Sequence, residues 1–222
     1  HAGPGYQQPR VGQCRALTYA QSKASSNASR AISCASGHTA QTIGVSKLPK
    51  KLTWKSPAAK VNAAMGKACT KAFAAKVGQT TGARQLSAYT WVGFKPTKSQ
   101  RRHGARWFRC DALMPQSGAL AALTRSTAPM LISPTPAAHA LCLDSSSRRT
   151  TCDRTHTFKA TSAFALSLKK WPGLTKVRAL AAAGCDTRVS TASYRYLAPS
   201  QASWSYSKWV TCFSVHPIAP PP

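Results

Sequence analysis

The sequence predicts an α+β protein of two tandem, disulfide-stapled domains, each with one helix packed on a small, mostly antiparallel sheet. Two observations predict this fold. The eight cysteines of the 222-residue chain fall into two sets of four with similar surroundings. Each set also encloses a segment of helical periodicity between apolar segments typical of strands. Internal similarity of this kind indicates a duplicated unit.

The residues around the cysteines match in the same order in both halves. Cys34-Ala-Ser-Gly-His38 corresponds to Cys152-Asp-Arg-Thr-His156, and Trp107-Phe-Arg-Cys110 corresponds to Trp209-Val-Thr-Cys212. Proline-rich stretches lie between and outside the two halves. We therefore expect an N-terminal tail over 1–10, a first repeat over 11–114, a linker over 115–138, a second repeat over 139–215 and a Pro-rich C-terminal tail over 216–222.

Each half is expected to contain one helix with a central cysteine. Ser56 as N-cap and Pro57 at the first helical position predict the start of the first helix, and Gly78 predicts its end. Pro172 and Gly173 open the corresponding helix of the second half. The apolar faces recur with a spacing of three to four residues. They comprise Val61, Met65, Ala68, Cys69, Ala72 and Phe73, and then Val177, Leu180, Ala181, Cys185 and Val189.

The remaining segments are predicted strands, so that each half has the order strand, strand, helix, strand, strand. In the first half they cover 13–19, 31–46, 85–94 and 106–113. In the second half they cover 140–143, 157–168, 192–197 and 209–215.

The number of cysteines indicates an oxidising compartment, so we expect a secreted protein or one at the cell surface. The stretch after His1 resembles the mature terminus left by signal removal. No run of about 20 apolar residues is present, and no transmembrane segment is expected.

All eight cysteines are expected in disulfides, although four cysteines per half allow three pairings. We predict the pairing that joins the first strand to the last and the helix to the sheet in each half. Its bonds are Cys14–Cys110, Cys34–Cys69, Cys142–Cys212 and Cys152–Cys185. Zinc at Cys34 with His38 and at Cys152 with His156 is the rival, but structural zinc sites use closely spaced cysteine pairs. Copper at His1, with His38 or His103 as second ligand, lacks supporting sequence around it. We expect no metal and no cofactor.

These motifs resemble the septum-formation-type domain of secreted and lipid-anchored actinobacterial proteins. Gly12-Gln13-Cys14 corresponds to its opening, Cys34 to His38 to its Cys-x-x-Pro-His motif with Gly37 in place of Pro, and Trp107 to Cys110 to its close. Ala68 to Phe73 corresponds to its helix, and Leu141-Cys142 opens the second copy. The resemblance implies association with the cell envelope and no catalytic mechanism.

The charge is strongly one-sided: 31 Lys and Arg against four Asp and no Glu give a net charge of +27. Such an imbalance favours a polyanionic partner, here nucleic acid, teichoic acid or polyphosphate bound without sequence specificity. A solvated, solubilising surface is the alternative. The predicted binding residues are Lys47, Lys50, Lys51, Lys55, Lys60, Lys67, Lys71, Arg101, Arg102 and Arg106, with Trp54 and Trp107 as aromatic neighbours.

We expect no enzymatic activity and no catalytic residues. Nucleophile-elbow, zincin and phosphate-loop motifs are absent from the sequence. The four aspartates lie beside cysteines, where local pairing with Arg or backbone N–H groups is expected. The alternative function is a structural subunit, a homo-oligomer or extracellular filament held by its Pro-rich tails.

Overall fold

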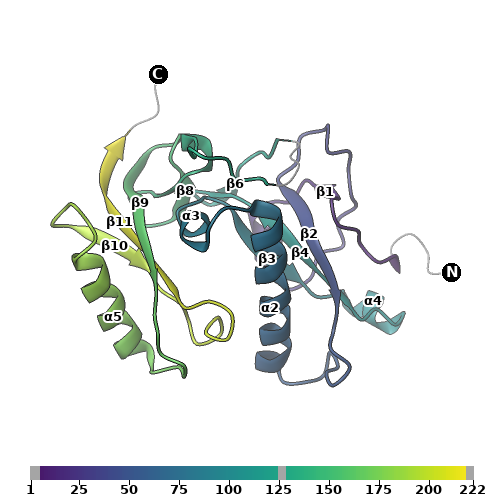
Figure 1. The fold of residues 1–222 in the computed structure, drawn as a ribbon. Coiled ribbons are helices and arrows are strands. Elements are labelled where there is room, and N and C mark those ends of the chain that lie inside the picture. The colour runs from purple at the N-terminus through teal and green to yellow at the C-terminus, as the bar shows by residue number, and fades with distance from the viewer. Residues whose placement is uncertain (1–5, 125–128, 219–222) are drawn as a thin grey trace.

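The computed structural model describes residues 6–124 and 129–218. Two sheets lie side by side, each with one long helix against it (Figure 1). The first half contains β1 (Cys14–Arg15), α1 (Tyr19–Ser22), β2 (Ala40–Lys47), α2 (Ala58–Val77), α3 (Thr81–Gln85), β3 (Thr90–Phe94), α4 (Lys98–Arg102) and β4 (Trp107–Leu113). The second contains β7 (Leu141–Leu143), β8 (Arg149–Thr151), β9 (His156–Ala165), α5 (Leu174–Asp186), β10 (Tyr194–Leu197) and β11 (Trp209–Ile218).

Both sheets are antiparallel, and three strands of each are connected in the same way. The first sheet has the order β1-β2-β4-β3, and the second has the order β10-β11-β9-β7-β8. In each, a strand is followed by the long helix and then by two strands, of which the last inserts between the other two. The predicted combination of helices with antiparallel sheets is therefore confirmed.

The two sheets also share an irregularity at the same place. In the first, Thr42 pairs with Asp111 and Gly44 with Cys110, so one residue of β2 bulges out. In the second, the pairing shifts between Cys212 and Phe213 of β11, against β9. Each bulge thus lies opposite the peptide bond that follows the last cysteine of its half.

Four disulfides use all eight cysteines, which confirms their expected role, but the predicted pairing is wrong. The bonds are Cys14–Cys34, Cys69–Cys110, Cys142–Cys152 and Cys185–Cys212. Cys14–Cys110 does not form because β2 lies between β1 and β4 in the sheet. Cys34 instead follows a bridge that Ile32 makes to Cys14, which brings it beside that strand.

The first long helix ends where the sequence predicts and starts one residue later. Pro57 is the N-cap of α2 and has no side-chain group to cap it. Ser56, the predicted cap, accepts a hydrogen bond from Thr53 N at its Oγ, at 2.9 Å. At the other end Gly78 has φ of 80°, a conformation that favours glycine, and its N–H bonds to Ala74 O.

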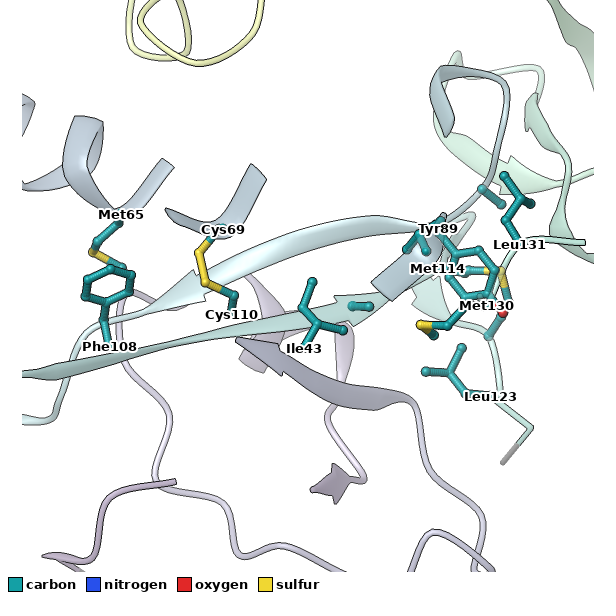
Figure 2. Packing of buried hydrophobic residues seen from close by; sticks show 14 of the residues in the cluster. Ile43, Met65, Cys69, Tyr89, Phe108, Cys110, Met114, Leu123, Met130 and Leu131 are labelled. Atoms are coloured by element: carbon teal, nitrogen blue, oxygen red, sulfur yellow. A yellow bond between two sulfur atoms is a disulfide. The ribbon is translucent and has the colours of Figure 1, made fainter. Parts of the chain in front are cut away.

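The core of the first half lies between α2 and the sheet. Met65 lies over Phe108, and the Cys69–Cys110 disulfide ties α2 to β4 (Figure 2). Tyr89 and Leu131 extend this core toward the second half (Figure 2). The helix is therefore held to its sheet both covalently and by apolar packing.

The described parts of the segment between the halves, 115–124 and 129–138, pack against the rest of the chain. It contains the hairpin of β5 (Pro115–Gln116) and β6 (Ala119–Leu120) and a 3-10 turn at Ala137–His139. Met130 and Leu131 are buried in the first core, and their N–H groups bond to the carbonyls of Lys76 and Val77 at the end of α2. These two apolar side chains of the predicted linker thus contribute to the core of the first half.

Several predicted strands are shorter or displaced. Residues 16–39 are mostly loop around α1 and the first disulfide, residue 85 ends α3, and β8 was not predicted. β11 continues through Ile218, into the segment predicted as a tail. In the predicted N-terminal tail, Tyr6 contacts Ser99 and His103, while residues 1–5 and 219–222 lie outside the described residues.

The loop before β11 joins the two halves by packing on α2. A Cβ atom at Gly66 would lie 2.1 Å from the ring of Tyr206, which also contacts Trp91 at 5.7 Å between ring centroids. Glycine here permits a close approach between the helix and a residue of the other half.

Replacement of Gly66 by alanine is expected to lower the free energy of unfolding by about 1–3 kcal/mol, because the ring must move. Gly82→Ala is the matched control, since its Cβ meets nothing closer than 4.0 Å in a helix, and it should stabilise slightly. Urea denaturation of both variants checks this; equal effects would contradict the close packing.

Candidate anion-binding groove

The loop from residue 48 to 57, here the 48–57 loop, is fixed to the start of β4 by an arginine. Arg106 Nη2 donates to the carbonyl oxygens of Leu48, Pro49 and Leu52 at 3.2, 3.2 and 3.0 Å. In return Leu48 N donates to Arg106 O at 2.7 Å. Arg106, which was predicted to bind a polyanion, is exposed, and the hydrogen bonds of its Nη2 hold this loop in place.

Trp54 is held in one orientation at the same place. Its indole Nε1 donates to Ala105 O at 2.7 Å, and the half-buried ring packs against the first core. The backbone N–H of Lys55 bonds to Thr53 Oγ1 at 3.2 Å, which fixes the turn that carries both side chains. A tethered aromatic ring with an exposed lysine next to it is thus presented to solvent.

The short helix α4 brings the second group of cations. Thr97 caps it: Thr97 Oγ1 accepts from Gln100 N at 3.1 Å, and Gln100 Oε1 accepts from Thr97 N at 2.8 Å. This reciprocal arrangement defines the first turn. Lys98, Arg101 and Arg102 are exposed on it.

Together the 48–57 loop and α4 form an open groove of about 600 Å³. Its lining consists of Thr53, Trp54, Lys55, Lys98, Arg101 and Arg102. Four cations around one ring, with no carboxylate in this lining, create a positive potential over a partly apolar floor. Four of these residues were predicted from the sequence: Trp54, Lys55, Arg101 and Arg102. Lys98 was not, and its signal was its position next to a capping threonine in a basic run.

The other predicted residues do not line this groove. Lys47, Lys50 and Lys51 are exposed near it along β2 and the 48–57 loop, and Lys60, Lys67 and Lys71 are exposed on α2. Trp107, the second predicted aromatic neighbour, is a buried strand residue with 7% exposure, whereas Trp54 is half-buried.

A buried charge network supports the sheet behind the groove. Asp111, which has no exposed surface, pairs with Arg109 at 3.0 Å and accepts from Thr42 Oγ1 at 2.8 Å. Arg15 Nη1 donates to Thr42 Oγ1 at 2.9 Å. Burial and the nearby Arg109 lower the pKa of Arg15 to about 10, and the carboxylate opposes that shift. The expected local pairing of Asp with Arg is confirmed here and at Asp144.

The histidines and cysteines considered for metals have other partners. Cys34 and Cys152 are in disulfides. His38 Nδ1 lies 2.9 Å from Ser36 O, and His156 Nδ1 lies 2.7 Å from Arg154 O. The equivalent histidines therefore make the same bond to the carbonyl two residues before.

Among residues 6–124 and 129–218, no three potential ligands gather in a metal cluster. His1, the copper candidate, lies outside the described residues. His103 stacks on Tyr6 at 3.7 Å between ring centroids. No helix in the described part of the chain has both the length and the apolar character to cross a membrane.

A comparison with known families identifies one match. The model of the family described as "Septum formation" matches residues 83–214, from α3 to β11. Of the motifs that carried the resemblance, Trp107–Cys110 and Leu141-Cys142 lie inside this match, whereas Cys14, Cys34 and Cys69 lie before it. No curated protein and no solved structure matches. Because the match covers more than half of the 222 residues, the chain belongs to the septum formation family.

Proposed function

We propose that this chain is a non-enzymatic protein of the cell envelope or extracellular space that binds an anionic polymer without sequence specificity. Membership of the septum formation family supports the envelope, and four disulfides support an oxidising compartment. Because every cysteine is in a disulfide, none is available as a thiolate nucleophile. The polymer is one rich in phosphate: nucleic acid, teichoic acid or polyphosphate.

The proposal includes a duplicated architecture, with septum-formation-like repeats over 11–114 and 139–215. Its support is the shared order of strand, helix and two strands, with equivalent helix-to-sheet disulfides. The equivalent bulges and histidine bonds add to it. The first repeat would bind, because the groove lies there.

The observation that carries the binding proposal is the groove between the 48–57 loop and α4. Lys55, Lys98, Arg101 and Arg102 converge there on an ordered tryptophan. Arginine matches phosphate with two parallel hydrogen bonds, and an indole face accepts a base or sugar ring. Nothing in this lining reads base edges, so recognition rests on charge and stacking.

Replacement of Lys55, Arg101 and Arg102 by glutamine is expected to weaken binding of a short duplex DNA about 10- to 100-fold at low salt. Each lost phosphate contact should lower the slope of log K against log salt concentration by about 0.9, so the slope falls by about 3. Fluorescence anisotropy over a salt series measures both. The matched control is K170Q/K176Q/R178Q, which removes the same charge from exposed positions of the second half.

Equal losses in the two triple variants would mean that net charge alone is responsible and would refute the groove. Duplexes of unrelated sequence should bind within a factor of about 2, since base readout would cost about 1–3 kcal/mol per mismatch. Binding of polyphosphate in the same salt series would show that a chain of phosphates is sufficient for recognition. Light scattering in high salt tests the structural alternative: large, salt-resistant particles without polymer would favour an assembly subunit.

A further inference from the structure

A second cavity lies at the junction of the two halves, away from the basic groove. It consists of two adjoining hollows of about 230 and 450 Å³. They share as lining Gln85, Thr90, Trp91, Arg149, Tyr206 and Ser207. Both halves therefore contribute, since Trp91 belongs to β3, Arg149 to β8 and Tyr206 to the loop before β11.

Arg149 is the unusual member of this lining. Its Nε is fully buried and has no hydrogen-bond partner among the described residues. The buried arginines of the first sheet differ, since Arg109 pairs with Asp111 and Arg15 donates to Thr42. The residue is partly exposed, but burial of its Nε without a counter-charge is costly, and desolvation lowers the pKa of Arg149. Thr70 Oγ1, in the wall of the smaller hollow, is likewise buried and without a partner.

The residues around Arg149 provide no negative charge. Neither lining contains an aspartate, and the sequence contains no glutamate. Burial raises the pKa of Tyr89 and of Tyr206, so both phenols stay neutral at neutral pH. Arg84, also in the lining of the smaller hollow, adds positive charge while donating to Gly78 O and Gln79 O.

The walls are suited to an apolar body next to an anion. The rings of Trp91 and Tyr206 lie 5.7 Å apart at an angle of 54° and form one side. Thr90, Ser207 and Gln85 are polar residues of the remaining shared lining. Few polar groups placed among aromatic walls are typical of small-molecule sites.

We propose that this junction cavity binds a small organic oxyanion, whose carboxylate or phosphate group pairs with the guanidinium of Arg149 and whose body lies against Trp91 and Tyr206. The planar fork of arginine matches either group through two parallel hydrogen bonds. The site is independent of the polymer groove, since the two share no lining residue.

Isothermal titration of the whole chain with benzoate, phenyl phosphate and neutral benzamide tests the site. We expect saturable binding of at least one anion with a Kd on the order of 1 mM, and none of benzamide. The better of the two anions identifies the head group. Arg149→Met should abolish binding, and Arg149→Lys, which keeps the charge without the fork, should weaken it about tenfold. The matched control is Arg154→Met, at an exposed position.

The melting temperature of Arg149→Met without ligand supplies a second readout. Removing a guanidinium whose buried Nε has no partner should raise the melting temperature by about 3 °C in a chain of this size. A purely structural arginine would give the opposite sign. The inference is overturned if neither anion binds, if benzamide binds equally, if Arg149→Met still binds, or if that variant melts lower than the wild type. None of these results bears on polymer binding at the groove.

Discussion

Asp111→Asn should lower the free energy of unfolding by about 3–5 kcal/mol, the cost of leaving a buried charge without its partner. Asp111 lies on the central strand β4 and has no exposed surface. Arg109 Nε lies 3.0 Å from both of its carboxylate oxygens, and Thr42 Oγ1 donates to one of them at 2.8 Å. Asparagine keeps the shape and an acceptor for Thr42 but removes the only negative charge in this cluster.

The loss is large because two guanidinium groups depend on one carboxylate. Arg15 is buried as well and is repelled by Arg109, while Asp111 attracts it. Without Asp111, both cations remain in a region of low dielectric constant, where repulsion is strong. Arg109 also lies over the ring of Phe94 at 4.7 Å, so it cannot move to water without disturbing the core.

The chain contains a matched control for this substitution. Asp144 pairs with Arg148 at 2.9 Å, but the arginine side chain is 57% exposed. Asp144→Asn therefore leaves a cation that water can solvate, and its cost should be about 1 kcal/mol or less. Urea denaturation of both variants measures the difference. Similar losses would show that the buried network contributes no more than a surface ion pair.

The helices could be predicted from the sequence because their signals are local. Apolar spacing and Gly78 define α2, and the same reasoning located α5 from Gly173 onward. The disulfide pairing could not be predicted, because it depends on which strands are neighbours. Cys110 faces the helix only because β4 inserts between β2 and β3, an order that differs from the order along the chain.

The residues of the candidate sites could likewise be predicted only where their signals are local in the sequence. The basic groove was partly predictable, since Trp54 and Lys55 are adjacent in sequence and Arg101 and Arg102 form a run. The carbonyl contacts of Arg106 and the burial of Trp107 could not be predicted, because they depend on how β4 packs against its neighbours. Arg149 was missed because its burial arises where the two halves meet. The signal available was the adjacent pair Arg148 and Arg149, of which Arg148 precedes β8 and is exposed, whereas Arg149 begins the strand.

Removal of the Cys69–Cys110 bridge by alanine at both positions should lower the free energy of unfolding by about 4 kcal/mol. The bond spans 41 residues and ties α2 to β4 at fully buried positions (Figure 2). In the chain-entropy view, the cross-link acts mainly by restricting the unfolded chain, and a longer loop gives a larger effect. The Cys142–Cys152 bridge spans only 10 residues, and its removal should cost about 3 kcal/mol.

The same double variant also tests the pairing itself. With Cys69 and Cys110 removed, Cys14 and Cys34 remain bonded to each other, so the folded protein should show no free thiol. Had Cys14 bonded to Cys110 and Cys34 to Cys69, the variant would expose two. Thiol titration in denaturant, with reduced protein as the reference, separates these outcomes even if the variant is too unstable for a full unfolding curve. Two thiols would refute the helix-to-sheet bridge, and with it the equivalence to Cys185–Cys212 that supports a duplicated unit.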